Sequence, residues 1–244
     1  MLPRRIIRCY RSMYLFTPAM VETERRLKEM HPEPEWEHLF CNHYEQRDWV
    51  AEHTPEWLEI YNFYPVDRQR EQVFRWLTLW KLGGFWLNTQ LRPFGTLEPL
   101  RERPLVLAEK RRMSPQEFEA LHRMPWDAVY PKEALVRISD QGFAAEPGHW
   151  FVERVLDVLI ERAGFLDGNF EPPPGEEEYT TGAGVLNTAW LSCLLEGRSA
   201  AAGDVILPAP PAPSKYRPPA NEPERREEPE GLGEYAYRHT DLNG

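Results

Sequence analysis

The sequence predicts a single α/β domain whose mostly parallel sheet is covered by helices on both faces. Short apolar runs alternate along the chain with longer stretches whose apolar residues recur every three or four positions. The first pattern is typical of buried strands and the second of helices packed on a sheet. With 244 residues, 41% of them hydrophobic, the chain can bury one large core.

The first half supplies three predicted strands, at residues 6–10, 39–41 and 85–87. Thr17-Pro18 places an N-cap and a first-turn proline before a helix that extends to about residue 30. Helical sequence also follows from about residue 47 and again after Thr54-Pro55. The clearest helix spans residues 67–82, with one apolar face, and two glycines end it.

The second half continues the alternation. Strands are predicted at 104–108, 205–207 and 235–237, and a strand pair at 134–138 and 142–145. A capping box at Ser114 starts one helix, and two more are predicted at 150–163 and from 183 to about 196. The Pro- and Glu-rich stretch predicts a loop, which divides the chain into a domain at 1–207, a loop at 208–233 and a completing strand at 234–244.

Composition narrows the class of protein. The net charge of −10 disfavours binding to nucleic acid or to an anionic membrane surface. Cys9, Cys41 and Cys193 are far apart and form no CxxC pair, so we expect buried free thiols in a reducing compartment. No apolar run approaches the roughly 18 residues of a membrane span, and the N-terminus lacks a signal-peptide pattern. We therefore expect a cytoplasmic protein without a transmembrane segment.

The most informative stretch is residues 75–90, RWLTLWKLGGFWLNTQ. It resembles glycosyltransferase family 32 and the wider group with a sugar-binding Asp-X-Asp region, through Arg75, Trp76, Leu79, Trp80, Gly83, Gly84 and Trp86. Residues 3–7, 33–40, 145–149, 181–182 and 235–239 resemble further elements of that family in the same order.

This resemblance implies a GT-A-like fold, a nucleotide-sugar donor such as a UDP- or GDP-hexose, and a glycan or other acceptor. The implied donor-binding positions are Ile7, Gln72, Arg75, Gly83, Gly84, Asn88, Gln90, Gly182, Lys215, Arg217, Arg238 and His239. No catalytic residue is assigned; the candidates are Glu109, Asp140 and His239.

The sequence departs from the family at the metal motif. Asn88 and Gln90 stand where the family has aspartates, and Gln72 replaces a further aspartate. Mg²⁺ and Mn²⁺ need charged oxygen ligands, whereas an amide offers one neutral oxygen. We therefore expect no metal site and no tightly bound cofactor, with Mn or Mg disfavoured. Cationic side chains would then neutralise the leaving diphosphate, the candidates being Arg68, Arg70, Arg75, Lys215, Arg217, Arg238 and His239.

Structural interpretations stand beside these functional ones. The glycine pair could simply end a helix, Trp86 could be buried against a helix, and Glu109 and Asp140 could be a solvated strand end and a turn. Two functional hypotheses remain: a hexosyltransferase without a tightly bound metal, and a catalytically silent relative that binds nucleotide sugars or glycans as an accessory subunit. Motifs of hydrolases, P-loop NTPases and dinucleotide-binding proteins are missing from the sequence.

Overall fold

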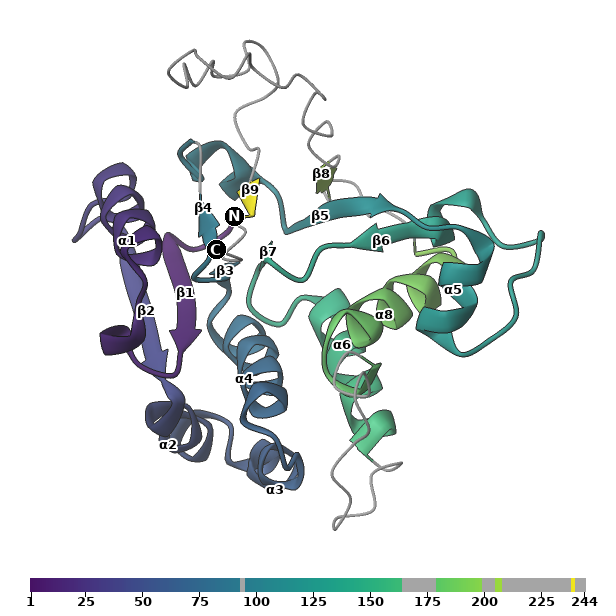
Figure 1. Cartoon of the computed structure of the whole chain (residues 1–244), viewed down its shortest axis with the longest axis horizontal. Coiled ribbons are helices and arrows are strands. Elements are labelled where there is room, and N and C mark those ends of the chain that lie inside the picture. Colours follow the sequence, from purple (N-terminus) through teal and green to yellow (C-terminus); the bar gives the residue numbers. More distant parts are fainter. Residues whose placement is uncertain (93–94, 164–178, 199–204, 208–237, 240–244) are drawn as a thin grey trace, which may run out of the picture.

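A computed structural model of the protein describes residues 1–92, 95–163, 179–198, 205–207 and 238–239. The main sheet has the order β2-β1-β3-β7-β5-β6, and β8 pairs with β5 (Figure 1). Its strands are β1 (Arg5–Tyr10), β2 (Glu37–Asn42), β3 (Gly84–Leu87), β5 (Leu105–Arg112), β6 (Val136–Ile138), β7 (Gly142–Ala145) and β8 (Val205–Leu207). A second, two-stranded sheet joins β4 (Leu91–Arg92) to β9 (Arg238–His239).

Strand direction in the main sheet is mixed. β1 pairs in parallel with β2 and β3, and β8 in parallel with β5. β7 runs antiparallel between β3 and β5, and β6 runs antiparallel to β5. Most described strands of this sheet therefore point the same way, as predicted, and β6 and β7 are the two that do not.

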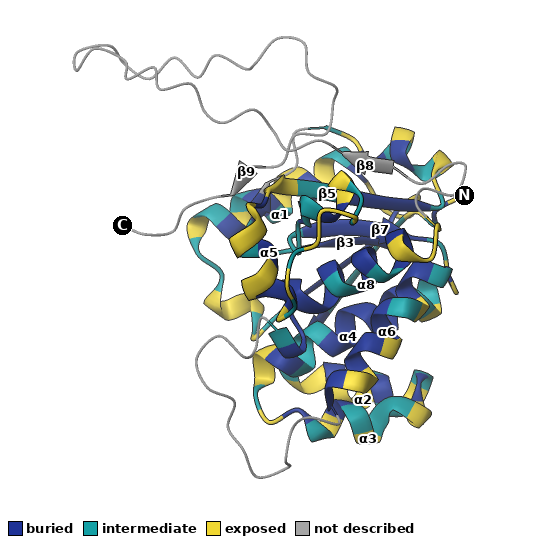
Figure 2. Ribbon diagram, turned by 90° about the vertical axis from the view of Figure 1, so that its right-hand side faces the viewer, coloured by how far each residue is buried: buried dark blue, intermediate teal, exposed yellow. Residues whose placement is uncertain are grey.

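Helices cover both faces of the sheet. They are α1 (Pro18–Met30), α2 (His43–His53), α3 (Leu58–Phe63), α4 (Asp67–Leu82), α5 (Pro115–His122), α6 (Trp150–Ala163) and α8 (Ala183–Leu195), with short 3-10 turns η1 (Met13–Leu15), η2 (Pro55–Trp57), η3 (Glu98–Glu102) and η4 (Lys132–Leu135). Because side chains alternate along a strand, Ile7 and Trp86 enter the core formed with α4, α6 and α8. Figure 2 shows these three helices together on one side of the sheet, with many buried segments. Ile6 and Phe85 face the other way, toward Leu27 of α1.

The local signals in the sequence explain most helix starts. Thr17 accepts a hydrogen bond from the backbone N–H of Met20 at 3.3 Å, and Ser114 forms the predicted capping box with Glu117. α2 begins earlier than predicted, at His43, because Asn42 and Glu45 form a reciprocal capping box. The segment after Thr54 starts as the 3-10 turn η2 before α3 begins.

One predicted pairing is wrong. Residues 134–138 and 142–145 do not form a strand pair, because β5 lies between β6 and β7 and hydrogen-bonds both. β5 is also longer than predicted and runs to Arg112, where it pairs with Val136. Residues up to Leu135 form η4 instead of strand. The hydrophobic pattern showed two strands but not which neighbour each would take.

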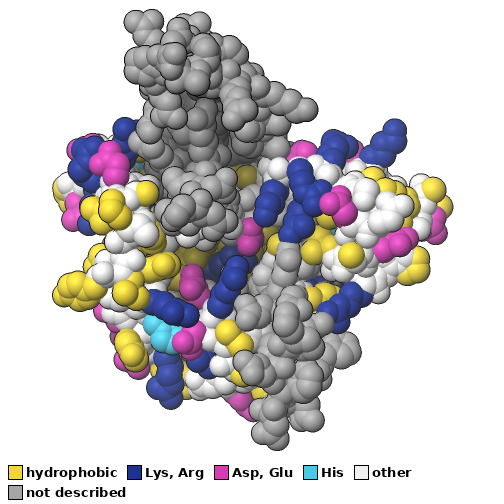
Figure 3. Space-filling view, in the orientation of Figure 1, with side chains coloured by type: hydrophobic (Ala, Val, Ile, Leu, Met, Phe, Trp, Pro, Cys, Tyr) yellow, Lys and Arg dark blue, Asp and Glu magenta, His cyan; other side chains and the backbone are white. Residues whose placement is uncertain are grey.

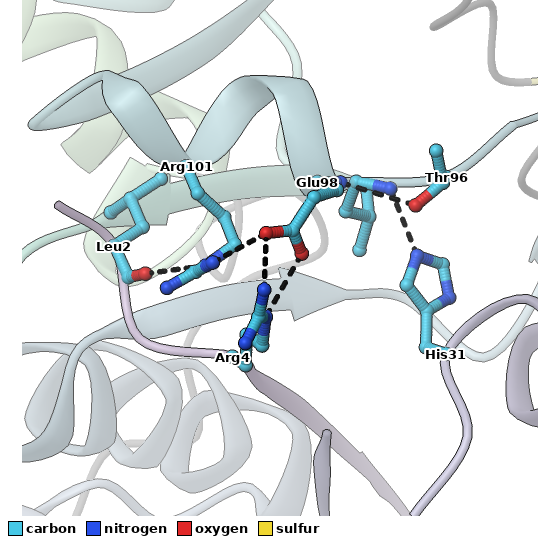
Figure 4. A network of polar contacts seen from close by, with 7 residues as sticks. Leu2, Arg4, His31, Thr96, Glu98 and Arg101 are labelled. Atoms are coloured by element: carbon cyan, nitrogen blue, oxygen red, sulfur yellow. Dashed lines mark hydrogen bonds and ion pairs between the residues drawn. The ribbon is translucent and has the colours of Figure 1, made fainter. Parts of the chain in front are cut away.

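A polar network fixes η3 against the start of the chain (Figure 4). Glu98 accepts from Arg4 at 2.7 and 3.0 Å and from Arg101 at 2.6 Å. Arg101 also donates to the carbonyl of Leu2 at 2.9 Å, and the buried ring of His31 accepts from Leu97 N at 2.9 Å. The segment that follows β4 is thereby held on the strand β1 and the end of α1.

Other expectations have mixed outcomes. All three cysteines are free and buried, as predicted. In the described part of the chain, no helix is long and apolar enough to cross a membrane. The predicted loop at 208–233 and strand at 235–237 lie outside the described residues, so the domain boundaries stay predictions. The cytoplasmic location also stays a prediction.

Candidate functional site at the sheet edge

The strand register brings several polar residues to one edge of the main sheet. Leu87 pairs with Gly142, so the next residue, Asn88, donates its N–H to the carbonyl of Gln141 at 2.7 Å. On the other side of β7, the N–H of Ser139 donates to the carbonyl of Ala108 at 2.7 Å. The end of β3, the beginning of β7 and the middle of β5 therefore lie side by side at the same height in the sheet. In α/β sheets, ligands bind at such carboxyl ends of strands.

Residues 88–90 form a closed turn at this edge. The Oδ1 atom of Asn88 accepts the backbone N–H of Gln90 at 2.9 Å, and the carbonyl of Asn88 accepts from Leu91 at 2.9 Å. Asn88 and Gln90 are half-buried, and β4 follows at once with β9 paired to it. The side-chain oxygen of Asn88 is thus engaged by its own turn.

Arg8 lies beneath this turn. It comes from β1, is almost fully buried, and forms an ion pair with Glu24 of α1. Its Nη2 donates to the carbonyl of Thr89 at 2.8 Å. Burial lowers the pKa of Arg8, and the neighbouring Glu24 opposes that shift. Arg8 therefore fixes the backbone of the turn and places a positive charge under it.

Arg75 is the buried cation on the α4 side of the site. Its Nη1 donates to the carbonyl of Asp140 at 3.1 Å, and its guanidinium lies 5.3 Å from the ring centres of Trp76 and Phe143. Burial lowers the pKa of Arg75 to about 10, so it remains charged at neutral pH. Its contacts connect helix α4 to the beginning of β7.

Asp140 is the carboxylate at this level of the edge. Burial raises its pKa, but Arg75, the hydrogen bond from Gln141 at 3.0 Å and nearby Lys110 outweigh burial, and the net shift is downward. Asp140 is therefore ionised at neutral pH and can accept a proton or a hydrogen bond.

A second carboxyl group lies one turn before Arg75. Glu71 is half-buried and shares a hydrogen bond with the thiol of Cys9 on β1. Burial raises the pKa of Glu71, although Arg75, Arg68 and the Cys9 bond partly counter that effect. Burial also raises the pKa of Cys9, so this thiol is not a nucleophile at neutral pH.

Several buried polar atoms around this edge have no hydrogen-bond partner among the described residues. They are Nε of Arg8, Oε1 of Gln72, Nε and Nη2 of Arg75 and Oε1 of Gln141. Each such atom costs about 1–3 kcal/mol. Hydrogen bonds join Arg8, Arg75 and Gln141 to residues 88, 89 and 140, and Gln72 lies one helical turn before Arg75. Unpartnered atoms on residues connected in this way indicate a site that keeps polar groups for a ligand. Acidic and basic side chains intermingle across the middle of the face seen in Figure 3.

The turn does not fit a divalent cation. Asn88 and Gln90 contribute no charge, and the Asn88 oxygen already accepts a backbone hydrogen bond. Within the described ranges, no group of three or more His, Cys, Asp or Glu side chains could hold a metal ion. Whether the whole protein works without a metal remains a prediction.

Other predicted donor-site residues lie elsewhere in the fold. Gly83 and Gly84 adopt φ values of +65° and +116° at the amino end of β3, away from Asn88. A Cβ on Gly83 would lie 2.5 Å from Cδ of Pro147, so a glycine is required there by packing. The side chain of Ile7 is fully buried in the core. Gly182 is the buried residue before α8.

The predicted cationic residues are only partly brought together. Arg68 is exposed at the start of α4, close enough to Arg75 and Glu71 to influence their charge. Arg70 instead pairs with Asp67 and donates to the carbonyl of Tyr64. Of the remaining candidates, only the backbones of Arg238 and His239 are described; they pair with β4 beside the 88–90 turn. Lys215 and Arg217 lie outside the described residues.

Sequence reasoning missed three residues at this edge: Arg8, Glu71 and Lys110. Arg8 carried a signal, since a charged residue inside an apolar strand must be paired. Glu71 was missed because the resemblance concerned only the neighbouring position, Gln72. Glu109 and Asp140, both candidates from the sequence, do lie at this edge. His149 is a helix-start residue whose Nδ1 accepts from Phe151 at 3.2 Å.

Comparison with known proteins agrees with the fold. No family model matches the chain. Over 157 residues it is 30% identical to inositol phosphoceramide mannosyltransferase 3 of Schizosaccharomyces pombe, covering 64% of this chain and 36% of that protein. The chain thus spans about a third of the length of this curated relative.

Among solved structures, PaToxG glycosyltransferase superposes with a TM-score of 0.52 over 81% of this chain and 74% of that one. Only 8% of residues are identical, so this likeness concerns the fold alone, which is GT-A-like. Both proteins carry the name of a glycosyltransferase.

Proposed function

We propose that this protein transfers a hexose from a nucleotide sugar to an acceptor hydroxyl, without a tightly bound divalent metal. The carrying observation concerns Arg8, Arg75 and Gln141 at the edge formed by β1, β3 and β7. Hydrogen bonds join them to residues 88, 89 and 140, and each keeps a buried polar atom without a partner among the described residues. Folded proteins rarely leave several buried polar atoms unpaired in one place unless a ligand uses them. The sequence similarity to a mannosyltransferase supports a nucleotide sugar as that ligand.

In this proposal the donor lies across the ends of β1 and β3. The amides of Gln72 and Gln141 offer both donors and acceptors to ribose and sugar hydroxyls. Both residues are half-buried, so their side chains lie just beneath the surface. Arg75, with Arg68 nearby at the start of α4, supplies positive charge where the leaving diphosphate develops negative charge.

Asp140 is the proposed base for the acceptor. Its carboxylate stays ionised beside Arg75 and Gln141, and it lies just before β7, the strand between β3 and β5. A general base must be charged at the working pH and within reach of the hydroxyl proton. Glu109 on β5 is the neighbouring alternative, although Arg112 lies 4.0 Å from its carboxylate.

The second hypothesis is that of a silent relative which binds donor or glycan without turnover. The replacement of charged by neutral side chains at residues 72, 88 and 90 favours this alternative. The two hypotheses share the same binding site and differ only in chemistry, so binding and turnover must be measured separately.

The test is a Gln72→Ala variant with Gln116→Ala as its matched control, since Gln116 is exposed on α5. We expect calorimetric titration in excess chelator to show UDP or GDP binding, weakened about tenfold or more by Gln72→Ala only. Because Oε1 of Gln72 is unpartnered, the melting temperature should not fall.

Turnover is then followed as hydrolysis or transfer from UDP- and GDP-hexoses in the same buffer. Release of nucleotide in chelator supports the transferase; binding without any release supports the silent relative. Failure of the wild-type protein to bind either nucleotide, with or without Mn²⁺, would overturn the transferase and would leave only a silent relative that binds glycans.

A further inference from the structure

A β-bulge interrupts β5 at the edge of the candidate site. Glu109 pairs with Ile138 and Arg111 with the adjacent Arg137, so Lys110 is the extra residue without a partner on β6. Bulges are common beside active sites, where they redirect a side chain. Lys110 is exposed and makes no ion pair within the described part of the chain.

Three consecutive basic residues lie at this bulge, although the whole chain has a net charge of −10. Lys110, Arg111 and Arg112 follow one another on the part of β5 that leaves the core. Arg111 is neutralised by Glu117 through two hydrogen bonds of 2.6 and 2.7 Å. Among the described residues, Glu109 is the acidic side chain that Arg112 approaches, at 4.0 Å, and the Arg112 side chain is 65% exposed. Lys110 and Arg112 are thus available to form ion pairs with a bound anion.

The position of Lys110 in the sheet indicates which substrate it faces. The carbonyl of Ala108 binds Ser139 N, and Lys110 is close enough to Asp140 to act on it electrostatically. β7 separates β5 from β3, so Lys110 lies across one strand from Asn88. Asp140, the proposed base, lies between them in strand order. Lys110 is therefore on the side of the edge opposite to the proposed donor, and Arg112 lies two residues further along β5, where it pairs with Val136.

We propose that Lys110 and Arg112 form an anion subsite for the acceptor, which carries a phosphate group near the hydroxyl that receives the sugar. This inference rests on the proposed function, because it takes the β1–β3 side as the donor site. A flexible ammonium and an exposed guanidinium are suited to phosphate oxygens. The acceptor's anion would hold its hydroxyl near Asp140.

The experiment compares two probes that differ only in charge, glucose 6-phosphate and glucose. Calorimetric titration at low salt uses the wild-type protein, Lys110→Gln, Arg112→Gln, the double variant and Lys81→Gln. Lys81 is an exposed lysine at the end of α4, near the amino end of β3, and gives the matched loss of charge. UDP and GDP are titrated into each protein in parallel.

We expect the wild-type protein to bind glucose 6-phosphate measurably more tightly than glucose. Each single variant should weaken glucose 6-phosphate binding several-fold, and the double variant about tenfold or more. Lys81→Gln should change nothing, and the affinity for UDP and GDP should stay the same in all variants. Added salt should weaken only the phosphate-dependent part.

Two results would overturn the inference while leaving the proposed function intact. One is equal affinity of the wild-type protein for the two probes, including no binding of either. The other is a loss of UDP or GDP binding in Lys110→Gln, which would assign this cation to the donor's diphosphate. Glucose 6-phosphate binding that depends on Lys110 in a protein that binds no nucleotide would support the subsite and refute the donor site.

Discussion

Acidification should destabilise the protein through a buried histidine, His122 at the end of α5. The ring is 8% exposed, lies 4.3 Å from the ring of Phe118, and faces the positive charge of Arg162. Burial first, and Arg162 second, lower the pKa of His122 from 6.5 to about 4. The neutral ring is therefore the form that the fold accommodates.

The sign follows from proton binding. Because the folded pKa is below the unfolded one, the unfolded chain binds the proton more readily as the pH falls. The stabilisation is present above about pH 6.5 and is lost toward pH 4. With these pKa values, linkage gives a loss of about 2 kcal/mol between about pH 7 and pH 5. The buried ring of His31, whose pKa is also lowered by burial, adds a loss of the same sign.

The assay is urea unfolding of the wild-type protein and His122→Gln across this pH range. The wild-type protein should lose about 2 kcal/mol more than the variant, because glutamine does not titrate. Equal losses in the two proteins would refute the reasoning. If the variant does not fold, NMR titration of the His122 ring in the wild-type protein gives its pKa directly. A pKa near 6.5 would also refute the reasoning.

The remaining predictions concern the glycines and the site. Gly83→Ala should lower the free energy of unfolding by roughly 2–4 kcal/mol in thermal or urea unfolding, because its Cβ would clash with Pro147. Gly197→Ala, where φ is +70° and the space is open, should cost about 1 kcal/mol. Similar costs for the two variants would contradict the packing argument. The double variant Asn88→Asp, Gln90→Asp should fold normally, because an aspartate at 88 can accept the same hydrogen bond within the turn. It should bind Mn²⁺ in calorimetric titration when UDP or GDP is present. No binding would show that the donor geometry differs. Glu71→Gln should flatten the loss of stability that the wild type shows as pH rises through the raised carboxyl pKa, measured by melting temperature against pH; an unchanged profile would place Glu71 in solvent.

The sequence predicted those elements whose signals are local. The helix at 67–82 and the strand at 205–207 have the predicted bounds, and the Thr17 and Ser114 caps form as expected. Each depends on neighbours within a few residues, so periodicity and capping chemistry suffice.

Strand order and the inner part of the site could not be read in this way. The insertion of β7 between β3 and β5 depends on packing between residues that are far apart in the chain. The contacts of Arg75 with Asp140 and of Glu71 with Cys9 span about 60 residues and therefore have no local signature. The resemblance identified Arg75 and Asn88, but the bulge that redirects Lys110 is visible only in the register.

The late position of β7 in the chain bears on how the protein assembles during synthesis. The parallel strands β2, β1 and β3 need only the first 87 residues, so this half can form while the rest is still being made. β7 must then join strands on both sides, which requires closing long loops and favours a slow final step. Asp140 and Gln141 precede β7 directly, so we expect the complete ligand edge to appear only in that step. Ligand binding would then report that the whole sheet has closed.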